Sequence, residues 1–324
     1  MLKNIFLVRS PLQIINAIEA KEHFKLNNTL LVMMFNKSHT NTKQMKDTMK
    51  LSSWDEVIVY EPNRKKSALL EQVKLIKKLK KDKYGYLFSG DFGTINKALI
   101  ANLEVGKIYL VDDGTAAIII HEKLYKKKKE AISKKLKLVR YSLFGLKYRI
   151  KQRVNFFTCF NLEKLGEEEI VINRYSHLQT HYLQRLEKDD KTYLLGQNLT
   201  EANYMDDKTY VSYIKKVIER YDGDIIYMPH RAEIISDDLK ALENDNFVFR
   251  ENKGPIELMF IEKGIYPFRI ISFFSSALFT LDRIFPDTSI EALNIKDNDL
   301  LSGKDKVRSA YSFFNGTGIK LVDL

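Results

Sequence analysis

The chain has 324 residues, 44% of them hydrophobic and 11% aromatic, which is enough apolar material for one large domain or two ordinary ones and excludes wholesale disorder. Its 53 Lys and Arg residues against 42 Asp and Glu give a formal net charge of +11, which indicates a polyanionic partner or an anionic membrane surface. The one cysteine, Cys159, excludes an internal disulfide framework and any zinc or iron–sulfur site built from several cysteines, and it favours a reducing compartment.

The amino terminus gives no targeting signal. Its short apolar run is interrupted at Arg9, unlike the roughly 7 to 15 apolar residues of a signal peptide. No stretch approaches the roughly 18 uncharged apolar residues of a membrane-spanning helix. We therefore expect a cytoplasmic protein, peripherally bound at the inner face of the membrane if its basic charge is used there.

In chain order, the first half alternates short apolar runs, typical of buried strands, with stretches that repeat apolar residues at helical spacing. Strands are expected at 5–8, 29–35, 56–60, 86–88 and 107–111, and helices at 12–20, 41–51, 67–80 and 96–103. Strands that alternate with helices form parallel β-α-β units. The first half is therefore predicted to be a doubly wound α/β domain.

A second series of the same kind follows the polar stretch 186–191. Strands are expected at 192–195, 224–228, 246–249, 269–273 and 281–285, and helices at 208–221, 232–242, 255–263 and 276–279. The sequence thus predicts two Rossmann-like domains, 1–188 and 189–324, with a cleft at the carboxyl ends of both sheets.

The positive charge is concentrated in one segment. Residues 121–153 hold 13 Lys or Arg and only two acids, a difference equal to the net charge of the whole chain. Interleaved apolar residues predict a basic amphipathic helix or helical hairpin, which suits an anionic bilayer. A solvated or oligomer-forming helix face is the alternative, and no DNA- or RNA-binding motif accompanies the charge.

Two acids at a strand end are the first candidates for chemistry. Asp112 and Asp113 close the predicted strand 107–111 and precede Gly114, so one carboxylate could act as a general base at the ligand-binding edge. Because successive strand residues point to opposite faces, only one of the two should reach a substrate. The ordinary alternative is a helix N-cap with its turn.

The second half places further polar residues at strand ends and helix starts. His230 and Arg231 follow the strand 224–228 and would suit an anionic ligand. Ser275 and Ser276 open a helix, where a phosphate is readily held, although a plain N-cap explains them equally well. Glu257, in the first turn of another helix, could accept the hydroxyls of a ribose or simply cap that helix. Together these residues suit group transfer from a nucleotide donor.

Several segments in order resemble the bacterial sialyltransferases of glycosyltransferase family 52. The matching segments are Phe6–Gln13, Asp112-Asp113-Gly114, Gly196–Leu199, Pro229-His230-Arg231 and Ser275-Ser276. The resemblance covers most of the chain, from residue 4 to about 290, and this chain carries His230-Arg231 where related families carry His-Pro.

The resemblance implies a GT-B fold and an inverting transferase that moves N-acetylneuraminate from CMP-N-acetylneuraminate to a terminal galactose of lipooligosaccharide or capsule, without a metal or another cofactor. It makes Asp112 the first choice for the base, with Asp113 and Asp207 as alternatives. It makes His230 the group that stabilises the leaving phosphate. The residues expected to hold the donor are Gln197, Asn198, Arg231, Glu257, Ser275 and Ser276.

Other interpretations stay open. Asp206 and Asp207 could instead form an ordinary acidic helix start. The enzyme could use a different nucleotide sugar, or the chain could be a non-enzymatic protein that binds anionic membranes or nucleic acid. No nucleic-acid partner is expected for a transferase, whereas a homodimer is compatible with it.

Overall fold

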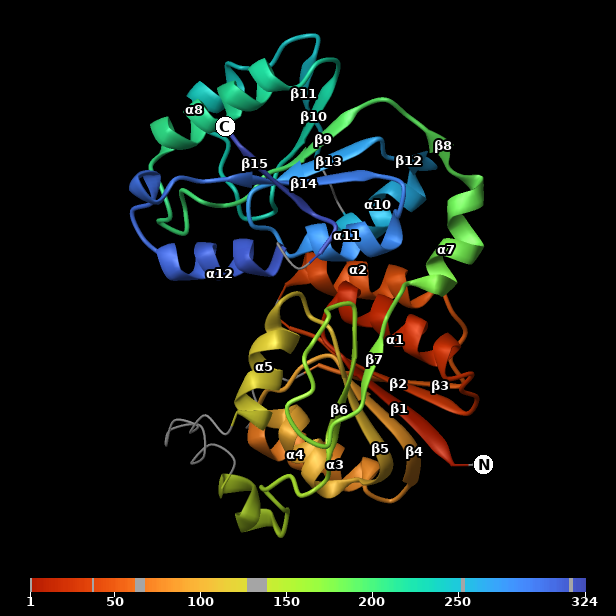
Figure 1. The fold of residues 1–324 in the computed structure, drawn as a ribbon. Coiled ribbons are helices and arrows are strands. Elements are labelled where there is room, and N and C mark those ends of the chain that lie inside the picture. The colour runs from red at the N-terminus through yellow and green to blue at the C-terminus, as the bar shows by residue number, and fades with distance from the viewer. Residues whose placement is uncertain (1, 37, 62–67, 127–138, 252–253, 315–316) are drawn as a thin grey trace. The chain divides into compact units, whose positions relative to one another are not determined.

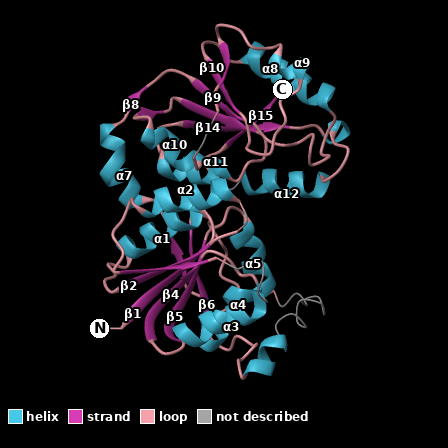
Figure 2. Ribbon diagram, turned by 180° about the vertical axis from the view of Figure 1, so that it is seen from behind, coloured by secondary structure: helices cyan, strands magenta, loops and turns pink. Residues whose placement is uncertain are grey.

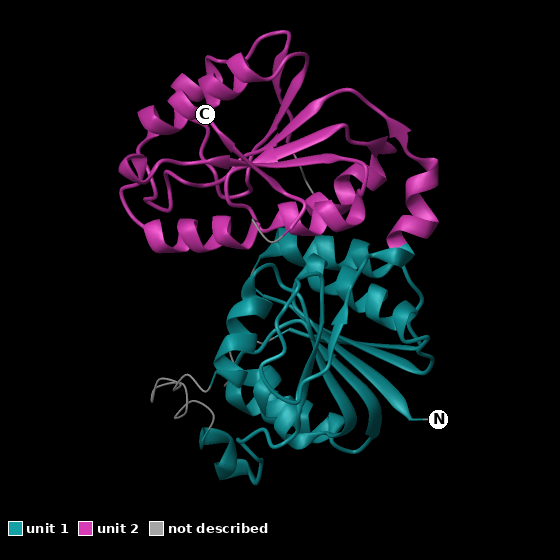
Figure 3. Cartoon of the chain, viewed as in Figure 1, with its two compact units in different colours: residues 1–177 teal, residues 178–324 magenta. Residues whose placement is uncertain are grey.

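A computed structural model describes residues 2–36, 38–61, 68–126, 139–251, 254–314 and 317–324. The chain divides into two compact units, residues 1–177 (unit 1) and 178–324 (unit 2), which Figure 3 colours separately. The division falls inside helix α7 (Ser176–Tyr182), eleven residues before the boundary at 188 expected from the sequence.

Unit 1 is built on a seven-stranded parallel sheet of order β3-β2-β1-β4-β5-β6-β7 (Figure 1). Its strands are β1 (Lys3–Val8), β2 (Thr29–Met34), β3 (Glu56–Tyr60), β4 (Lys83–Ser89), β5 (Glu104–Val111), β6 (Val154–Thr158) and β7 (Ile170–Ile172). Besides α7, its helices are α1 (Pro11–His23), α2 (His39–Met49), α3 (Ala68–Leu79), α4 (Thr94–Asn102), α5 (Ala116–Tyr125) and the 3-10 helix η1 (Arg140–Phe144).

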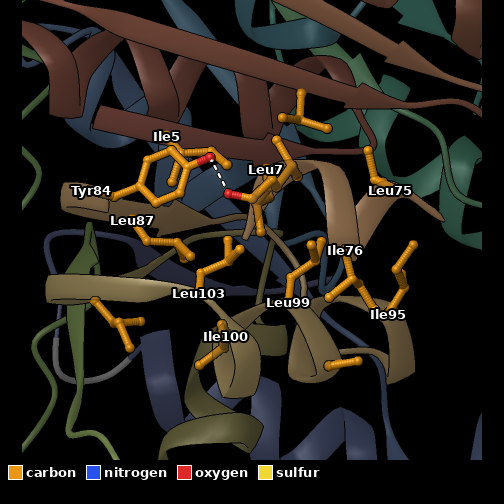
Figure 4. Close-up of a cluster of buried hydrophobic side chains, with 14 of the residues drawn as sticks. Ile5, Leu7, Leu75, Ile76, Tyr84, Leu87, Ile95, Leu99, Ile100 and Leu103 are labelled. Carbon is orange, nitrogen blue, oxygen red and sulfur yellow. Dashed lines mark hydrogen bonds between the residues drawn. The ribbon is translucent and has the colours of Figure 1, made fainter. Parts of the chain in front are cut away.

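Both faces of this sheet are covered, which is why its central strands are continuous apolar runs. One face packs against Ile14 and Ala17 of α1 and Met45 of α2. The other face forms the cluster in Figure 4, in which Leu7 lies with Leu99 of α4 and with residues of α3. The Tyr84 hydroxyl, a polar group within this apolar cluster, donates a hydrogen bond to the carbonyl oxygen of Leu79 at 2.9 Å.

Unit 2 holds a six-stranded parallel sheet of order β11-β10-β9-β13-β14-β15 and a two-stranded sheet of β12 and β8. Its strands are β8 (Glu187–Lys188), β9 (Thr192–Leu195), β10 (Ile225–Met228), β11 (Phe247–Phe249), β12 (Ile265–Tyr266), β13 (Arg269–Ser272), β14 (Ser289–Asn294) and β15 (Lys320–Asp323). Its helices are α8 (Asp207–Arg220), α9 (Asp237–Lys240), α10 (Ile256–Glu262), α11 (Ala277–Ile284), α12 (Lys304–Phe314) and the 3-10 helices η2 (Leu183–Arg185) and η3 (Asp297–Asp299). Figure 2 shows α8 and α9 on one face of the sheet and α10, α11 and α12 on the other.

The predicted alternation of strands and helices is confirmed in both units, but two elements were predicted wrongly. The strand expected at 281–285 belongs to α11, because Leu278, Leu281 and Ile284 recur at helical spacing and bury one face of that helix. The helix expected at 232–242 is only the short α9, preceded by a loop that begins at the end of β10. The sequence analysis also assigned no element to β6, β7, α5, β14, α12 or β15.

The basic segment 121–153 is described only in part, since residues 127–138 of the predicted amphipathic insertion lie outside the described residues. Its start belongs to the core: His121 of α5 is 3% exposed and lies 2.8 Å from the Glu168 carboxylate. Its end is a surface, where Leu143 of η1 is 83% exposed. Of the helices described, none combines the length and apolarity that crossing a bilayer requires.

Candidate functional site

Each sheet collects polar residues at its carboxyl edge, at the point where the strand order reverses. In unit 1 that point lies between β1 and β4, and in unit 2 between β9 and β13. Open α/β sheets bind their ligands at such positions. The candidate residues are described below for each unit by itself.

The edge of unit 1 brings together residues from three adjacent strands. Arg9 follows β1, Asp91 follows β4 and Asp113 follows β5. The Arg9 guanidinium pairs with the Asp91 carboxylate at 2.9 Å, and the Ser10 hydroxyl donates to Asp113 Oδ1 at 3.2 Å. Gly114, with φ of +56°, turns the chain directly after Asp113. The result is an exposed carboxylate beside a partly exposed ion pair.

Asp113 is electrostatically suited to accept a proton. Desolvation by the surrounding protein raises its pKa, and the nearby Asp91 carboxylate adds to this, although hydrogen bonds from Gln13 and Ser10 oppose it. A carboxylate with a raised pKa is a better base near neutral pH. Of the two adjacent acids, Asp113 is the one at the surface.

Asp112 lies in the interior instead. Asp112 is only 1% exposed, and its Oδ2 accepts a hydrogen bond from the Cys159 backbone N–H at 2.7 Å. Its carbonyl oxygen accepts from Asn16 at 3.0 Å, so the residue joins β5 to α1 and to the end of β6. Burial raises the pKa of Asp112 to about 6. Cys159 itself is buried, as expected of a small hydrophobic residue.

A small pocket opens beside Asp113. It has a volume of about 10 Å³ and is lined by the polar Asp91 and Asp113 and by an apolar wall. The wall consists of Leu110, Val111, Ala116, Ala117 and Ile120, with Gly90 at the end of β4. This volume is about the minimum that one water molecule needs, so the pocket is a small hollow beside Asp113 and does not by itself accommodate a sugar.

In unit 2, the Gln197 side chain ties the ends of β9 and β13 together. Its Oε1 accepts from the Phe274 backbone N–H at 3.0 Å and from the Ser272 hydroxyl at 3.3 Å. Asn198, the next residue, is partly exposed at the same edge. The structure therefore brings Gln197, the Ser275 loop and the start of α11 into one place, as the sequence analysis expected of donor-binding residues.

His230 follows β10 at the same edge, two strands from β13. Its Nδ1 accepts a hydrogen bond from the Ala232 backbone N–H at 3.2 Å, so the proton of the neutral ring is on Nε2. Desolvation and the Arg231 charge lower the pKa of His230, against an opposing effect of Glu201. The neutral ring therefore presents an N–H donor. Arg231 is exposed beside it.

Ser275 and Ser276 lie at the start of α11, as predicted. The Ser275 hydroxyl accepts from the Ala277 backbone N–H at 3.3 Å, and Ser276 is the N-cap residue, with no capping hydrogen bond from its own side chain. Both side chains are partly exposed. This helix start thus offers two hydroxyls and the positive end of the helix dipole to an anion.

Glu257 and Asp206 have structural partners instead. Glu257, in the first turn of α10, is 6% exposed and accepts from the Thr280 hydroxyl at 3.2 Å. Asp206 caps α8 by accepting from the Thr209 backbone N–H at 2.9 Å, and Asp207 is the first residue of that helix. The helix-start interpretation of Asp206 and Asp207 is therefore the one that the structure supports.

The sequence analysis missed Glu233, which lies in the loop after β10. Its carboxylate contacts two buried tyrosines and the His230 backbone N–H. No motif marked it, and the only available signal was an acid three residues after His230. Among the described residues, no group of three or more His, Cys, Asp or Glu side chains is arranged to hold a metal ion.

Comparisons with known proteins agree with the two-unit α/β fold described above. A family model described as alpha-2,8-polysialyltransferase matches residues 4–294. No curated protein matches the chain.

Solved structures share the fold at low identity. The UDP-GlcNAc 2-epimerase of Methanocaldococcus jannaschii is 14% identical with a TM-score of 0.52, covering 100% of this chain and 89% of its own. A putative UDP-N-acetylglucosamine 2-epimerase of Listeria monocytogenes is 11% identical with a TM-score of 0.54, covering 97% and 88%. MurG of Acinetobacter baumannii is 9% identical with a TM-score of 0.50, covering 99% and 85%. The fold is therefore of the GT-B type, with two Rossmann-like units.

Proposed function

The chain belongs to the alpha-2,8-polysialyltransferase family, and from this premise we propose that it is an inverting sialyltransferase that uses CMP-N-acetylneuraminate. The family supports glycosyl transfer. The carboxyl edge of the sheet in unit 1 carries groups suited to deprotonate an acceptor, and that of unit 2 carries groups suited to hold the donor phosphate. The proposal rests on what each unit carries by itself at its carboxyl edge: an exposed strand-end carboxylate, Asp113, in unit 1, and a neutral strand-end imidazole, His230, in unit 2.

The proposed chemistry starts at the acceptor. Asp113 takes the proton of an acceptor hydroxyl while the hydroxyl oxygen forms a bond to the anomeric carbon of the sialyl group. The bond from that carbon to the CMP phosphate oxygen breaks, and CMP leaves with the electron pair. Attack on the face opposite the leaving group inverts the anomeric configuration.

The proposed donor site is the edge of unit 2. The His230 Nε2–H donates to the phosphate oxygen on which negative charge develops. The hydroxyls of Ser275 and Ser276, at the positive end of the α11 dipole, hold the same phosphate, and Arg231 adds positive charge. Gln197 orders this loop, since it is the acceptor for Phe274. A monophosphate leaving group needs less neutralisation than a diphosphate, so we propose that the reaction requires no metal.

For the acceptor, we propose two candidates, of which the first is the terminal galactose of a bacterial surface glycan expected from the sequence and the second is a sialylated terminus. The name of the family favours the second, and so does Arg9, whose guanidinium at the edge of unit 1 could pair with a carboxylate of the acceptor. Turnover with a β-galactoside and with its sialylated counterpart distinguishes the two.

We also propose that the basic segment binds anionic lipid at the inner membrane face. In its described part, Lys147, Arg149, Lys151 and Arg153 are all exposed, and Leu143 is the most exposed of the large apolar side chains described. Each such cation near an anionic surface contributes about 1 kcal/mol.

The central test measures CMP release from CMP-N-acetylneuraminate with both acceptors, with and without EDTA. Asp113→Asn and His230→Ala should each lower kcat by roughly 100-fold or more, while Asp112→Asn, the matched control, should stay within about threefold of wild type. Turnover that collapses in Asp112→Asn and survives in Asp113→Asn would reverse the assignment of the base. A folded wild type that releases no CMP would refute the donor.

A further inference from the structure

Glu233 forms the centre of a polar cluster beneath the edge of unit 2. Its Oε1 accepts from the Tyr210 hydroxyl at 3.1 Å and from the Tyr227 hydroxyl, and the two hydroxyl oxygens lie 2.8 Å apart. Tyr210 comes from α8 and Tyr227 from β10, and both are buried at 2% exposure or less. The carboxylate is therefore fixed by two rigid elements of the unit.

The other carboxylate oxygen holds the His230 turn. Glu233 Oε2 accepts from the His230 backbone N–H at 2.8 Å, and the Glu233 backbone N–H donates to the His230 carbonyl at 2.8 Å. Inside this closed turn, the Ala232 N–H points at His230 Nδ1. The turn thus determines both the place of the imidazole and the nitrogen that carries its proton.

The cluster also reaches the loop after β9. The Tyr210 hydroxyl accepts from the Gln197 backbone N–H at 3.3 Å, and Glu201 of that loop accepts from the Ile234 N–H at 2.6 Å. Gly196 at the end of β9 leaves the space that Glu233 occupies, because a Cβ on this residue would overlap Glu233 Oε2 and the Tyr227 hydroxyl. The end of β9 is therefore shaped around the carboxyl group.

We propose that Glu233 is a positioning residue that anchors the His230 turn to Tyr210 and Tyr227 and thereby keeps the imidazole in its Nε2–H form at the donor-binding edge. The inference rests on the proposed role of His230 in the transfer reaction. Glu233 contacts neither substrate in this scheme and acts only through the turn.

The charges around the cluster predict that it titrates near neutrality. Burial raises the pKa of Glu233 to about 7 against hydrogen bonds from Tyr227, His230 and Tyr210, and the Glu201 carboxylate raises it further. Burial also raises the pKa of both tyrosines well above the ordinary value, so they stay protonated. A proton on Oε1 can be shared with the tyrosine hydroxyls while Oε2 keeps its bond to His230.

The first experiment follows the His230 ring and amide by NMR in the full chain, with His230→Ala to assign the signals. In the wild type, the ring nitrogens should show the Nε2–H tautomer, and the His230 amide proton should show an inflection near pH 7. Glu233→Gln should keep the tautomer, since its amide oxygen can still accept from His230, and lose the inflection. Glu233→Ala should lose the tautomer preference. The exposed Asp238→Ala on α9 is the matched control and should leave both signals unchanged.

The second experiment measures turnover of CMP-N-acetylneuraminate. Glu233→Ala should lower kcat by roughly 10- to 100-fold with the donor KM changed less than about threefold, and Glu233→Gln should restore most of kcat. An unchanged His230 signal in Glu233→Ala, an inflection that persists in Glu233→Gln, or a Glu233→Gln variant as inactive as Glu233→Ala would each overturn the inference. Because the NMR measurements need no turnover, they decide the positioning role even if the proposed donor proves wrong, and Glu233→Gln decides it if Glu233→Ala does not fold.

Discussion

Replacing Asp112 by asparagine measures the free energy that its burial costs. The side chain lies in the interior and holds the Cys159 backbone N–H through Oδ2. An asparagine side chain has nearly the same shape, and its amide oxygen can accept the same hydrogen bond. The substitution therefore removes the titration of the carboxyl group while it keeps the packing.

The magnitude follows from the pKa of Asp112, which burial raises to about 6 in the folded state. The unfolded value is about 3.9, so the folded state binds the proton more tightly. The free energy of unfolding of the wild type is consequently highest below about pH 4 and falls as the pH rises towards about 6. The full difference is about 3 kcal/mol, of which about 1.3 kcal/mol is expected between pH 5 and pH 7.

The assay is urea denaturation of wild type and Asp112→Asn at pH 5, 6 and 7. Since asparagine does not titrate, the stability of the variant relative to the wild type should increase over this range by about 1.3 kcal/mol. Any constant offset from altered hydrogen bonds cancels in this comparison, and Asp238→Asn, on the exposed side of α9, serves as the control for an acid at the surface. A relative stability that does not change with pH, or that falls as the pH rises, would refute the structural reading of Asp112.

Three further outcomes are expected. Charge reversal of Arg149, Lys151 and Arg153 should lower binding to vesicles with anionic lipid by at least tenfold in a sedimentation assay, since each cation contributes about 1 kcal/mol at the surface. Turnover with a water-soluble acceptor should stay intact. Unchanged vesicle binding would contradict the membrane proposal. Arg9→Ala should raise the KM of a sialylated acceptor more than that of a galactoside, and equal effects on both would argue against carboxylate recognition. Glu257→Ala should cost about 0.5–1.5 kcal/mol in urea denaturation, because it removes one hydrogen bond of the buried Thr280 hydroxyl, which keeps its bond to the Ala277 carbonyl oxygen, and should leave the donor KM unchanged; a large rise in the donor KM would restore Glu257 as a ribose ligand.

The strands that the sequence predicted best are those buried on both faces. The residues of β2, β9 and β10 are all buried, so each appears as an unbroken apolar run. A similar apolar run at 281–285 was wrongly predicted to be a strand. It belongs to the buried helix α11, and five residues are too few to reveal helical periodicity. Short strands such as β7, with three residues, carry too little pattern to be recognised.

The sequence predicted which loops carry the candidate residues, but it did not predict which side chains in those loops are exposed. The strand ends at Asp113, Gln197, His230 and Ser275 follow from the alternation of elements, because parallel strands end at one edge. The choice between Asp112 and Asp113 did not follow, since β5 is buried on both faces at its end and alternation alone does not say which side chain enters the core. Glu233 could not be found either, because its partners Tyr210 and Tyr227 are ordinary core residues in composition and no motif connects them to it.

The parallel topology also has a consequence for synthesis of the chain. Within unit 1, β1 lies in the middle of its sheet and pairs with both β2 and β4, which follow it in the chain, so both neighbours are available only after residue 89 has been made. All of unit 1 has left the ribosome once residue 177 has emerged, whereas unit 2 needs the last strand, β15, to finish its sheet. Since domains made first generally fold first, translation itself gives unit 1 the opportunity to fold before unit 2 is complete.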